Sequence, residues 1–276
     1  MEEIIDFHTH NFPDALAPRA VECMVEKINR ALIPVGDGTL AAQLRDMDRA
    51  GVSKAVVCPV ATKPTQFQAI FDRAKAVRDG DFGNDAASRL VQLCSVHPED
   101  RDYAAHLKEV AAAGFKGIKL HPFYQGFRLD DPEVFPYFSA LRDAGLFVVV
   151  HCGLDLGFVD VPMSCGPAQV AALLRAVPGL TFIAAHLGGC GGNPPHATDE
   201  LLEFPGCYLD TAVICCCDDD PESQRIMAEW PAERLIFASD YFWRDETHIA
   251  NWVRRFRPDR TDLAKIFSGN ARRLLG

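Results

Sequence analysis

The chain has 276 residues, of which 48% are hydrophobic and 24% are charged, and such a chain can bury a large core, which excludes disordered and collagen-like proteins. Its 28 Lys and Arg stand against 38 Asp and Glu, giving a formal charge of −10, and the basic residues form no stripe. We therefore expect neither nucleic acid nor an anionic membrane as a partner.

Short runs of β-branched and aromatic residues recur along the chain, and the segments between them carry apolar residues at helical spacing. The predicted strands are, in chain order, 4–8, 54–60, 90–96, 115–120, 147–152, 181–186, 207–212 and 235–240. Repeated βα units in a chain of this length predict an α/β protein with a single (β/α)8 barrel, the TIM-barrel fold, over residues 1–276. An open doubly wound sheet is the alternative, because periodicity alone does not show that a sheet closes.

The longest interruption of this rhythm lies between residues 11 and 38. Three prolines, Pro13, Pro18 and Pro34, flank a predicted helix over 19–33 in this segment. We interpret residues 11–38 as a candidate lid over the mouth of the barrel. Further along, the pairs 131–132 and 220–221 each place an aspartate before a proline, which predicts the start of a helix.

The sequence begins with acidic residues and shows neither the basic region nor the cleavage site of an export signal, so we expect a cytoplasmic protein. Apolar runs such as 146–150 are far shorter than the ~20 residues that a membrane-spanning helix needs. Most of the ten cysteines lie in apolar strand-like runs, which predicts reduced, buried thiols. The run 215–217 of consecutive cysteines is interpreted in the same way.

Residues that can bind metal lie at the ends of several predicted strands. His8 and His10 end the first strand in Asp-Phe-His-Thr-His, and strand alternation places them with Asp6 on one side. Other such residues end later strands: Lys119 with His121, then His151, His186 and Asp240. Because all these ends meet on one face of a parallel barrel, we expect a site for a divalent metal ion there. Zinc is the first expectation, with Mn, Fe or Co as alternatives, bound as one or two ions.

These motifs give the sequence a family resemblance. The Asp-x-His-x-His of the first strand, Val-Val-Val-His-Cys-Gly at His151, Ala-Ala-His-Leu-Gly-Gly at His186 and Ala-Ser-Asp at Asp240 resemble the amidohydrolase superfamily. The resemblance spans nearly the whole chain, from Ile4 to Leu275. More narrowly, the sequence is similar to the branch that includes predicted metal-dependent hydrolases and the aminocarboxymuconate semialdehyde and resorcylate decarboxylases.

The resemblance implies roles for individual residues. His8, His10, His151 and Asp240 would bind the metal, and Asp240 would also contact the metal-bound water. His186 would be either a ligand of a second ion or a catalytic group beside a single ion. Three imidazoles and one carboxylate leave an open position for water, as a catalytic site needs.

Lys119 has two interpretations. Two-metal members of the superfamily carry a carboxylated lysine at this place, so Lys119 would bridge two ions. In the other interpretation it is an inward lysine held by a carboxylate such as Asp6 or Asp210. His121, in Gly-Ile-Lys-Leu-His-Pro, departs from the two-metal pattern and leaves both interpretations open.

Residues after the metal-binding strands are candidates for contact with a small-molecule substrate. We expect His121, Tyr124, Arg128 and Trp243 to bind it, with the arginine contacting a carboxylate and the aromatic rings covering an apolar part. The alternative for Arg128, slightly favoured, is an ion pair with Asp130 or Asp131.

The leading hypothesis is a metal-dependent hydrolase in which a metal-bound water attacks an amide, lactone or other ester carbonyl, with Asp240 and His186 as the catalytic residues. The alternative is a metal-dependent decarboxylase or hydratase acting on a small carboxylated substrate. A third interpretation is a non-catalytic barrel whose metal site is closed by Cys152 or Cys190. Such enzymes commonly form homodimers, so a homodimer is also expected.

Overall fold

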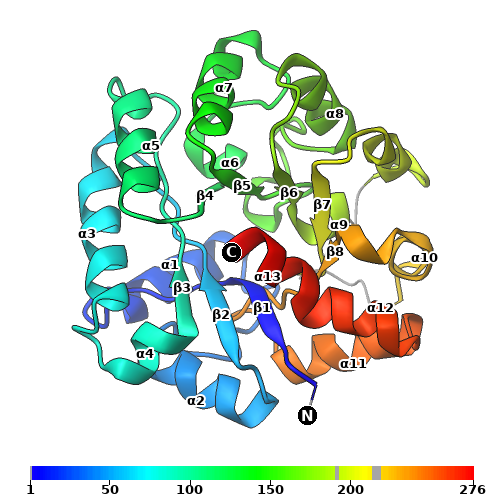
Figure 1. Cartoon of the computed structure of the whole chain (residues 1–276), viewed down its shortest axis with the longest axis horizontal. Coiled ribbons are helices and arrows are strands. Elements are labelled where there is room, and N and C mark those ends of the chain that lie inside the picture. The colour runs from blue at the N-terminus through cyan, green and yellow to red at the C-terminus, as the bar shows by residue number, and fades with distance from the viewer. Residues whose placement is uncertain (1, 190–192, 213–218) are drawn as a thin grey trace.

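The computed structural model describes residues 2–189, 193–212 and 219–276. Eight parallel strands form its centre (Figure 1). They are β1 (Ile5–Thr9), β2 (Lys54–Val57), β3 (Leu90–Gln92), β4 (Gly117–Leu120), β5 (Phe147–Val150), β6 (Phe182–Ala184), β7 (Cys207–Asp210) and β8 (Leu235–Ile236). Ladder hydrogen bonds join β1, β2 and β3 in that order into one series of strands. They join β4, β5, β6, β7 and β8 in that order into a second series.

Backbone hydrogen bonds between these two series close the ring. Between β3 and β4, the amide of Cys94 donates to the carbonyl of Gly117 (3.2 Å), and the amide of Lys119 donates to the carbonyl of Cys94 (2.9 Å). Between β8 and β1, the amide of Phe7 donates to the carbonyl of Phe237 (2.9 Å). The predicted (β/α)8 barrel is thereby confirmed, and the open-sheet alternative is not adopted.

Every predicted strand coincides with an observed one, but the observed strands are shorter at their carboxyl ends, except β1, which extends to Thr9, and β4, which ends at Leu120 as predicted. The prediction over 90–96 corresponds to Leu90–Gln92, and the prediction over 181–186 to Phe182–Ala184. At the latter end the backbone turns sharply, because His186 and Leu187 adopt left-handed conformations with φ of 58° and 52°. The last residues of the predicted strands therefore belong to the mouth of the barrel rather than to the ladder.

Helices surround the ring and connect its strands (Figure 1). The α-helices are α1 (Ala17–Lys27), α2 (Leu40–Ala50), α3 (Phe67–Arg78), α4 (Asn84–Arg89), α5 (Tyr103–Ala112), α6 (Pro122–Gln125), α7 (Phe135–Asp143), α8 (Pro167–Ala176), α9 (Ala185–Gly189), α10 (Pro221–Glu229), α11 (Glu246–Phe256), α12 (Arg260–Ala264) and α13 (Asn270–Leu275). The shorter helical turns are η1 (Pro64–Gln66), η2 (Pro132–Val134), η3 (Leu156–Phe158), η4 (Ala197–Glu203), η5 (Ala232–Arg234) and η6 (Lys265–Gly269).

The predicted helix starts and ends follow from local chemistry. Asp131 and Asp220 accept backbone hydrogen bonds from Glu133 and Ser223, as expected for N-caps. The helix predicted over 19–33 is displaced, because α1 begins at Ala17 and ends at Lys27. Shortly beyond it, Asn29 and Arg30 have φ of 52° and 56°, which a continuing right-handed helix does not allow.

Apolar side chains form two clusters on opposite sides of the strands. The larger cluster lies between the strands and the surrounding helices, as expected for a barrel covered by helices. The smaller cluster combines strand residues such as Ile5, Phe7 and Ile236 with Ala271 of α13, and Leu274 packs against it. Figure 1 shows α13 crossing the centre of the ring, where it covers the first residues of the strands. One end of the barrel is thus closed, and the polar strand ends lie at the other.

Among the described helices, none combines the length and the hydrophobicity that crossing a bilayer requires. Cys58, Cys94, Cys152 and Cys207 are buried, as predicted, whereas Cys23 is exposed. The predicted reduced state stays a prediction. Cys190 and the run 215–217 lie outside the described residues.

A close contact between two glycines supports the mouth of the barrel. Gly153, just after β5, has φ of 85°, and a Cβ there would lie 2.5 Å from Cα of Gly189. We expect Gly153→Ala to lower the free energy of unfolding by about 3 kcal/mol, from backbone strain and the clash with backbone atoms. The matched control is Gly114→Ala, where φ is 86° but nothing lies within 4 Å, so only about 1 kcal/mol is expected. Urea denaturation measures both, and equal losses would contradict the packing argument.

Candidate metal centre

A cavity of about 670 Å³ contains most of the predicted site residues. Its polar wall comes from strand ends: His8, His10, Lys119, His121, His151, His186 and Asp240. Much of the remaining wall is apolar and belongs to the segment 11–38, including Phe12, Leu16, Met24, Ile28 and Leu32. The segment interpreted as a lid therefore borders the cavity, while its movement stays a prediction.

Nε2 of His10 faces the carboxylate of Asp240. The Nδ1–H of His10 donates to the backbone carbonyl of Cys58 (2.9 Å), and a carbonyl can only accept. In the neutral ring, Nε2 is then an acceptor, and it lies 3.0 Å from Oδ1 of Asp240. This buried oxygen makes no hydrogen bond of acceptable geometry with the described residues. In the neutral ring, two acceptors therefore face each other, and a proton on Nε2 or a metal ion between the two atoms makes this arrangement favourable.

His8 presents a second nitrogen at the same place. Its Nδ1–H donates to Oδ2 of Asp210 (2.9 Å), and its Nε2 accepts from Nζ of Lys119 (2.6 Å). That Nε2 lies 3.8 Å from Oδ1 of Asp240. Burial, helped by the positive charge of Lys119, lowers the pKa of His8 well below its ordinary value, so the ring is neutral.

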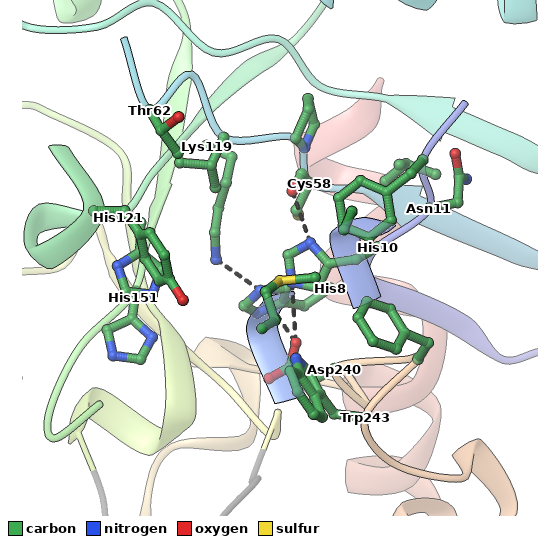
Figure 2. A pocket seen from close by; sticks show the side chains of 18 of the residues that line it. His8, His10, Asn11, Cys58, Thr62, Lys119, His121, His151, Asp240 and Trp243 are labelled. Carbon is green, nitrogen blue, oxygen red and sulfur yellow. Dashed lines mark hydrogen bonds and ion pairs between the residues drawn. The ribbon is translucent and has the colours of Figure 1, made fainter. Parts of the chain in front are cut away.

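These contacts make His8, His10 and Asp240 a good donor set for a divalent ion (Figure 2). One donor atom from each residue lies within 4.8 Å of the others. The outer nitrogens of both rings are fixed by oxygen partners, an arrangement that orients histidine ligands in metal sites. The residues present therefore fit the ion predicted from the sequence.

The backbone brings Asp240 into this position. Its amide donates to the carbonyl of His8 (2.9 Å), and its φ of 63° turns the chain beyond β8. Burial raises the pKa of Asp240, but the facing rings of His8 and His10, in their protonated forms, more than offset this, so the net pKa lies below the ordinary value. The side chain is thus an ionised carboxylate at the wall of the cavity.

The first strand reaches this geometry through an irregularity rather than through simple alternation. Its pairing with β2 shifts register between Asp6 and Thr9. As a result Asp6 does not join the histidines, and its carboxylate accepts hydrogen bonds from the amide and hydroxyl of Ser239. The expectation that Asp6, His8 and His10 share one side is therefore corrected for Asp6.

A second group of donors contains His121, His151 and Asp155. Nε2 of His121 lies 3.2 Å from Oδ2 of Asp155. The rings of His121 and His151 stack at 4.0 Å with an angle of 12° between their planes. Because an imidazole lone pair lies in the plane of its ring, two stacked rings do not direct their lone pairs to one point. We therefore consider the first group the better metal site.

His186 orients His151. The Nδ1–H of His186 donates to the carbonyl of Ala212, so in the neutral ring its Nε2 accepts from Nδ1–H of His151 (3.0 Å). Nε2 of His151 is then an acceptor, and it is buried without a hydrogen-bond partner in the described part of the chain. This nitrogen is available to a ligand, while both nitrogens of His186 are engaged.

The amine of Lys119 is held by an imidazole. Its hydrogen-bond partner is Nε2 of His8, whereas the carboxylate of Asp210 lies on the other nitrogen of the same ring. The interpretation of Lys119 as an inward lysine held directly by Asp6 or Asp210 is therefore modified. Its predicted bridging role stays a prediction.

The four predicted substrate-binding residues separate into two groups. His121, Tyr124 and Trp243 line the cavity. Arg128 does not, and its guanidinium instead donates to both carboxylate oxygens of Asp130 (3.0 and 2.9 Å). This is the ion pair that the sequence analysis favoured.

Sequence reasoning missed several residues near the site. Asp155 and the pair of Arg73 with Asn11 border the cavity, and no motif in the sequence marks them. Asp210, considered from the sequence only as a partner of Lys119, contacts His8 instead. Cys152, the candidate for a closed structural site, donates its thiol to the carbonyl of Val150 and belongs to neither donor group.

The contact of Asp210 with His8 leads to a testable expectation. Asp210→Asn removes the charge that fixes the outer nitrogen of His8 but preserves the shape of the side chain. We expect the affinity for zinc to fall about 10- to 100-fold, as for other changes to residues that orient a ligand. Competition with a chromophoric chelator measures the affinity, and an unchanged value would show that Asp210 does not support the site.

A sequence profile of the family described as Amidohydrolase (Amidohydro_2) matches residues 5–276. No curated protein matches the chain.

Several solved structures share the fold. An uncharacterized TIM-barrel protein from Bordetella bronchiseptica has a TM-score of 0.74 and 18% identity, with 99% of this chain and 98% of that chain covered. A dihydroxybenzoic acid decarboxylase from a Polaromonas species, with bound manganese and an inhibitor, has a TM-score of 0.67 and 16% identity, covering 100% and 97%. A probable 2-pyrone-4,6-dicarboxylic acid hydrolase from Acinetobacter baumannii has a TM-score of 0.66 and 15% identity, covering 100% of both chains.

Proposed function

We propose, since the chain belongs to the amidohydrolase family, that this enzyme is a metal-dependent hydrolase of an ester, lactone or amide bond in a small molecule. The observation that carries the proposal is the pair of facing acceptors, Nε2 of His10 and Oδ1 of Asp240, at 3.0 Å in a buried cavity wall. Only a cation or a proton between them makes this arrangement favourable.

His8, His10 and Asp240 would hold the ion. The predicted role of His151 as a further ligand stays a prediction, for which its unpartnered Nε2 is available. Zinc is the first candidate, with manganese, iron and cobalt as alternatives. When bound, a divalent cation acts as a Lewis acid on a carbonyl oxygen and lowers the pKa of water.

The protein residues supply the proton transfers. Asp240 is ionised and keeps an oxygen without a hydrogen bond, so it can accept a proton from the attacking water. The protonated carboxyl can then return that proton to the leaving group. His186 acts through His151, whose tautomer it fixes.

A decarboxylase is the second candidate, because of the position of Lys119. Its buried amine lies at the centre of the donor residues, 2.6 Å from His8, where a cationic group can orient a carboxylated substrate. Two of the proteins with similar structures are named as dihydroxybenzoate decarboxylases, and dihydroxybenzoates are carboxylated substrates of this kind.

The test compares the two reactions on one preparation. Protein reconstituted with zinc, and separately with manganese, is assayed with aryl esters, lactones and anilides, and in parallel with hydroxybenzoic acids for CO₂ release. Hydrolysis that disappears with chelator and returns with metal supports the proposal. Chelator-sensitive CO₂ release without hydrolysis would replace it by the decarboxylase.

A further inference from the structure

We propose that Arg73 and Asn11 form a carboxylate-binding subsite in the wall of the cavity. The substrate of the proposed reaction would then carry a carboxylate, on an apolar body, away from the bond that reacts. The reaction part of this inference rests on the proposed function, whereas binding of the carboxylate does not.

Arg73 has no ion-pair partner among the described residues, although the charge of Asp14 acts on it from a greater distance. This half-buried residue of α3 lines the cavity, and its Nη2 donates to the neutral Oδ1 of Asn11 (2.8 Å). Within the described ranges no acidic group lies at ion-pair distance from it. Arg89 and Arg225 are also half-buried, but each forms an ion pair. Nη1 of Arg89 lies 2.6 Å from Oδ1 of Asp48, and Nη2 of Arg225 lies 2.7 Å from Oδ1 of Asp199. A guanidinium has five N–H donors, so Arg73 keeps donors for an anion in the cavity.

A chain of buried hydrogen bonds fixes the direction of the Asn11 amide. The carbonyl of Val56 can only accept, so it receives the hydroxyl of Thr9 (2.9 Å). The same oxygen of Thr9 accepts from Nε2 of Gln43 (2.7 Å), which turns Oε1 of Gln43 toward Nδ2 of Asn11 (2.7 Å). Oδ1 of Asn11 is thereby left for Arg73. The guanidinium is thus held in place by a hydrogen bond to a neutral amide and not by an ion pair with a described carboxylate.

The subsite and the metal centre line the same cavity, and one residue of each belongs to the same segment. Asn11 directly follows His10, and Figure 2 shows the two side chains on the same stretch of chain. The cavity volume of about 670 Å³ exceeds what a carboxylate and a reacting carbonyl need. Other cavity-lining residues are large and apolar, including Phe12, Ile70, Phe242 and Trp243. These features favour a substrate with an aromatic or branched apolar body between its carboxylate and its reactive group.

The test uses metal-free protein, so that it does not depend on catalysis. Calorimetry measures the binding of 4-phenylbutyrate and of its neutral analogue, 4-phenylbutyramide. We expect Arg73→Gln to weaken carboxylate binding at least about 10-fold and to leave amide binding unchanged, because only the carboxylate pairs with the guanidinium. Arg128→Gln, which alters an arginine outside the cavity, should leave both affinities unchanged.

Two further variants separate the sources of any effect. Asn11→Asp places a carboxylate against Arg73 and should weaken carboxylate binding as Arg73→Gln does, without removing the arginine. Lys119→Met tests the other cation in the cavity wall. The proposal is overturned if Lys119→Met is the only variant that abolishes carboxylate binding. It is also overturned if Arg73→Gln leaves both affinities unchanged, as expected for Arg128→Gln, or if the wild type binds the amide more tightly than the carboxylate. Failure of the proposed hydrolysis would show only in the assays with metal.

Discussion

Asp240→Asn should lower kcat/KM for ester hydrolysis by about 10³-fold or more while leaving the fold intact. The change keeps the size of the side chain but removes a buried negative charge that both attracts the ion and accepts a proton. General base catalysis alone typically contributes 10²- to 10⁴-fold, and loss of a metal ligand adds to this. Steady-state kinetics at saturating zinc, with metal content measured on the same sample, give the result.

The matched control is Asp259→Asn, which alters a helix-capping aspartate at the start of α12. It should leave both the stability and kcat/KM nearly unchanged, because asparagine caps a helix about as well as aspartate. Wild-type activity in Asp240→Asn at full folding would remove this residue from the reaction and with it the assignment of the proton acceptor.

His8→Ala and His10→Ala should both abolish measurable metal binding and activity, but only His8→Ala should strongly destabilise the metal-free protein. His8 pairs with the buried carboxylate of Asp210, whereas His10 donates to a backbone carbonyl. His8→Ala leaves the buried carboxylate of Asp210 without this hydrogen bond, and losing a donor to a buried charged group is costly, so we expect a loss of about 3 kcal/mol for His8→Ala. For His10→Ala about 1 kcal/mol is expected.

Urea denaturation in the presence of chelator isolates this difference from the contribution of the metal. If the two variants lose equal stability, the Asp210 contact does not stabilise the fold. If His10→Ala retains full metal affinity, the donor set is wrong.

The fold was predictable because a (β/α)8 barrel repeats one local pattern. Each strand, such as β5 with its run of valines, is buried on both faces and reads as a short apolar segment. Strand ends were less predictable, because left-handed residues such as His186 bend the chain out of the ladder, and side-chain pattern does not encode that bend.

The polar strand ends were predictable for the same reason: parallel strands place their carboxyl ends together. The sequence could not show which donors share one point. His151 stacks on His121 and pairs with His186, and Asp6 is turned away by the register shift in β1. Arg73 lies on a helix among apolar neighbours, and only the fold brings it to Asn11.

Metal content per chain, measured by elemental analysis on protein purified without added metal or chelator, tests the central claim most directly. The account predicts at least one divalent transition-metal ion per chain in the wild type and none in His10→Ala. A Lys119→Met sample measured alongside tests the bridging role, since loss of a second ion would support it and an unchanged single ion would not. A wild-type protein that contains no such ion, even after reconstitution with zinc and manganese, would contradict the account.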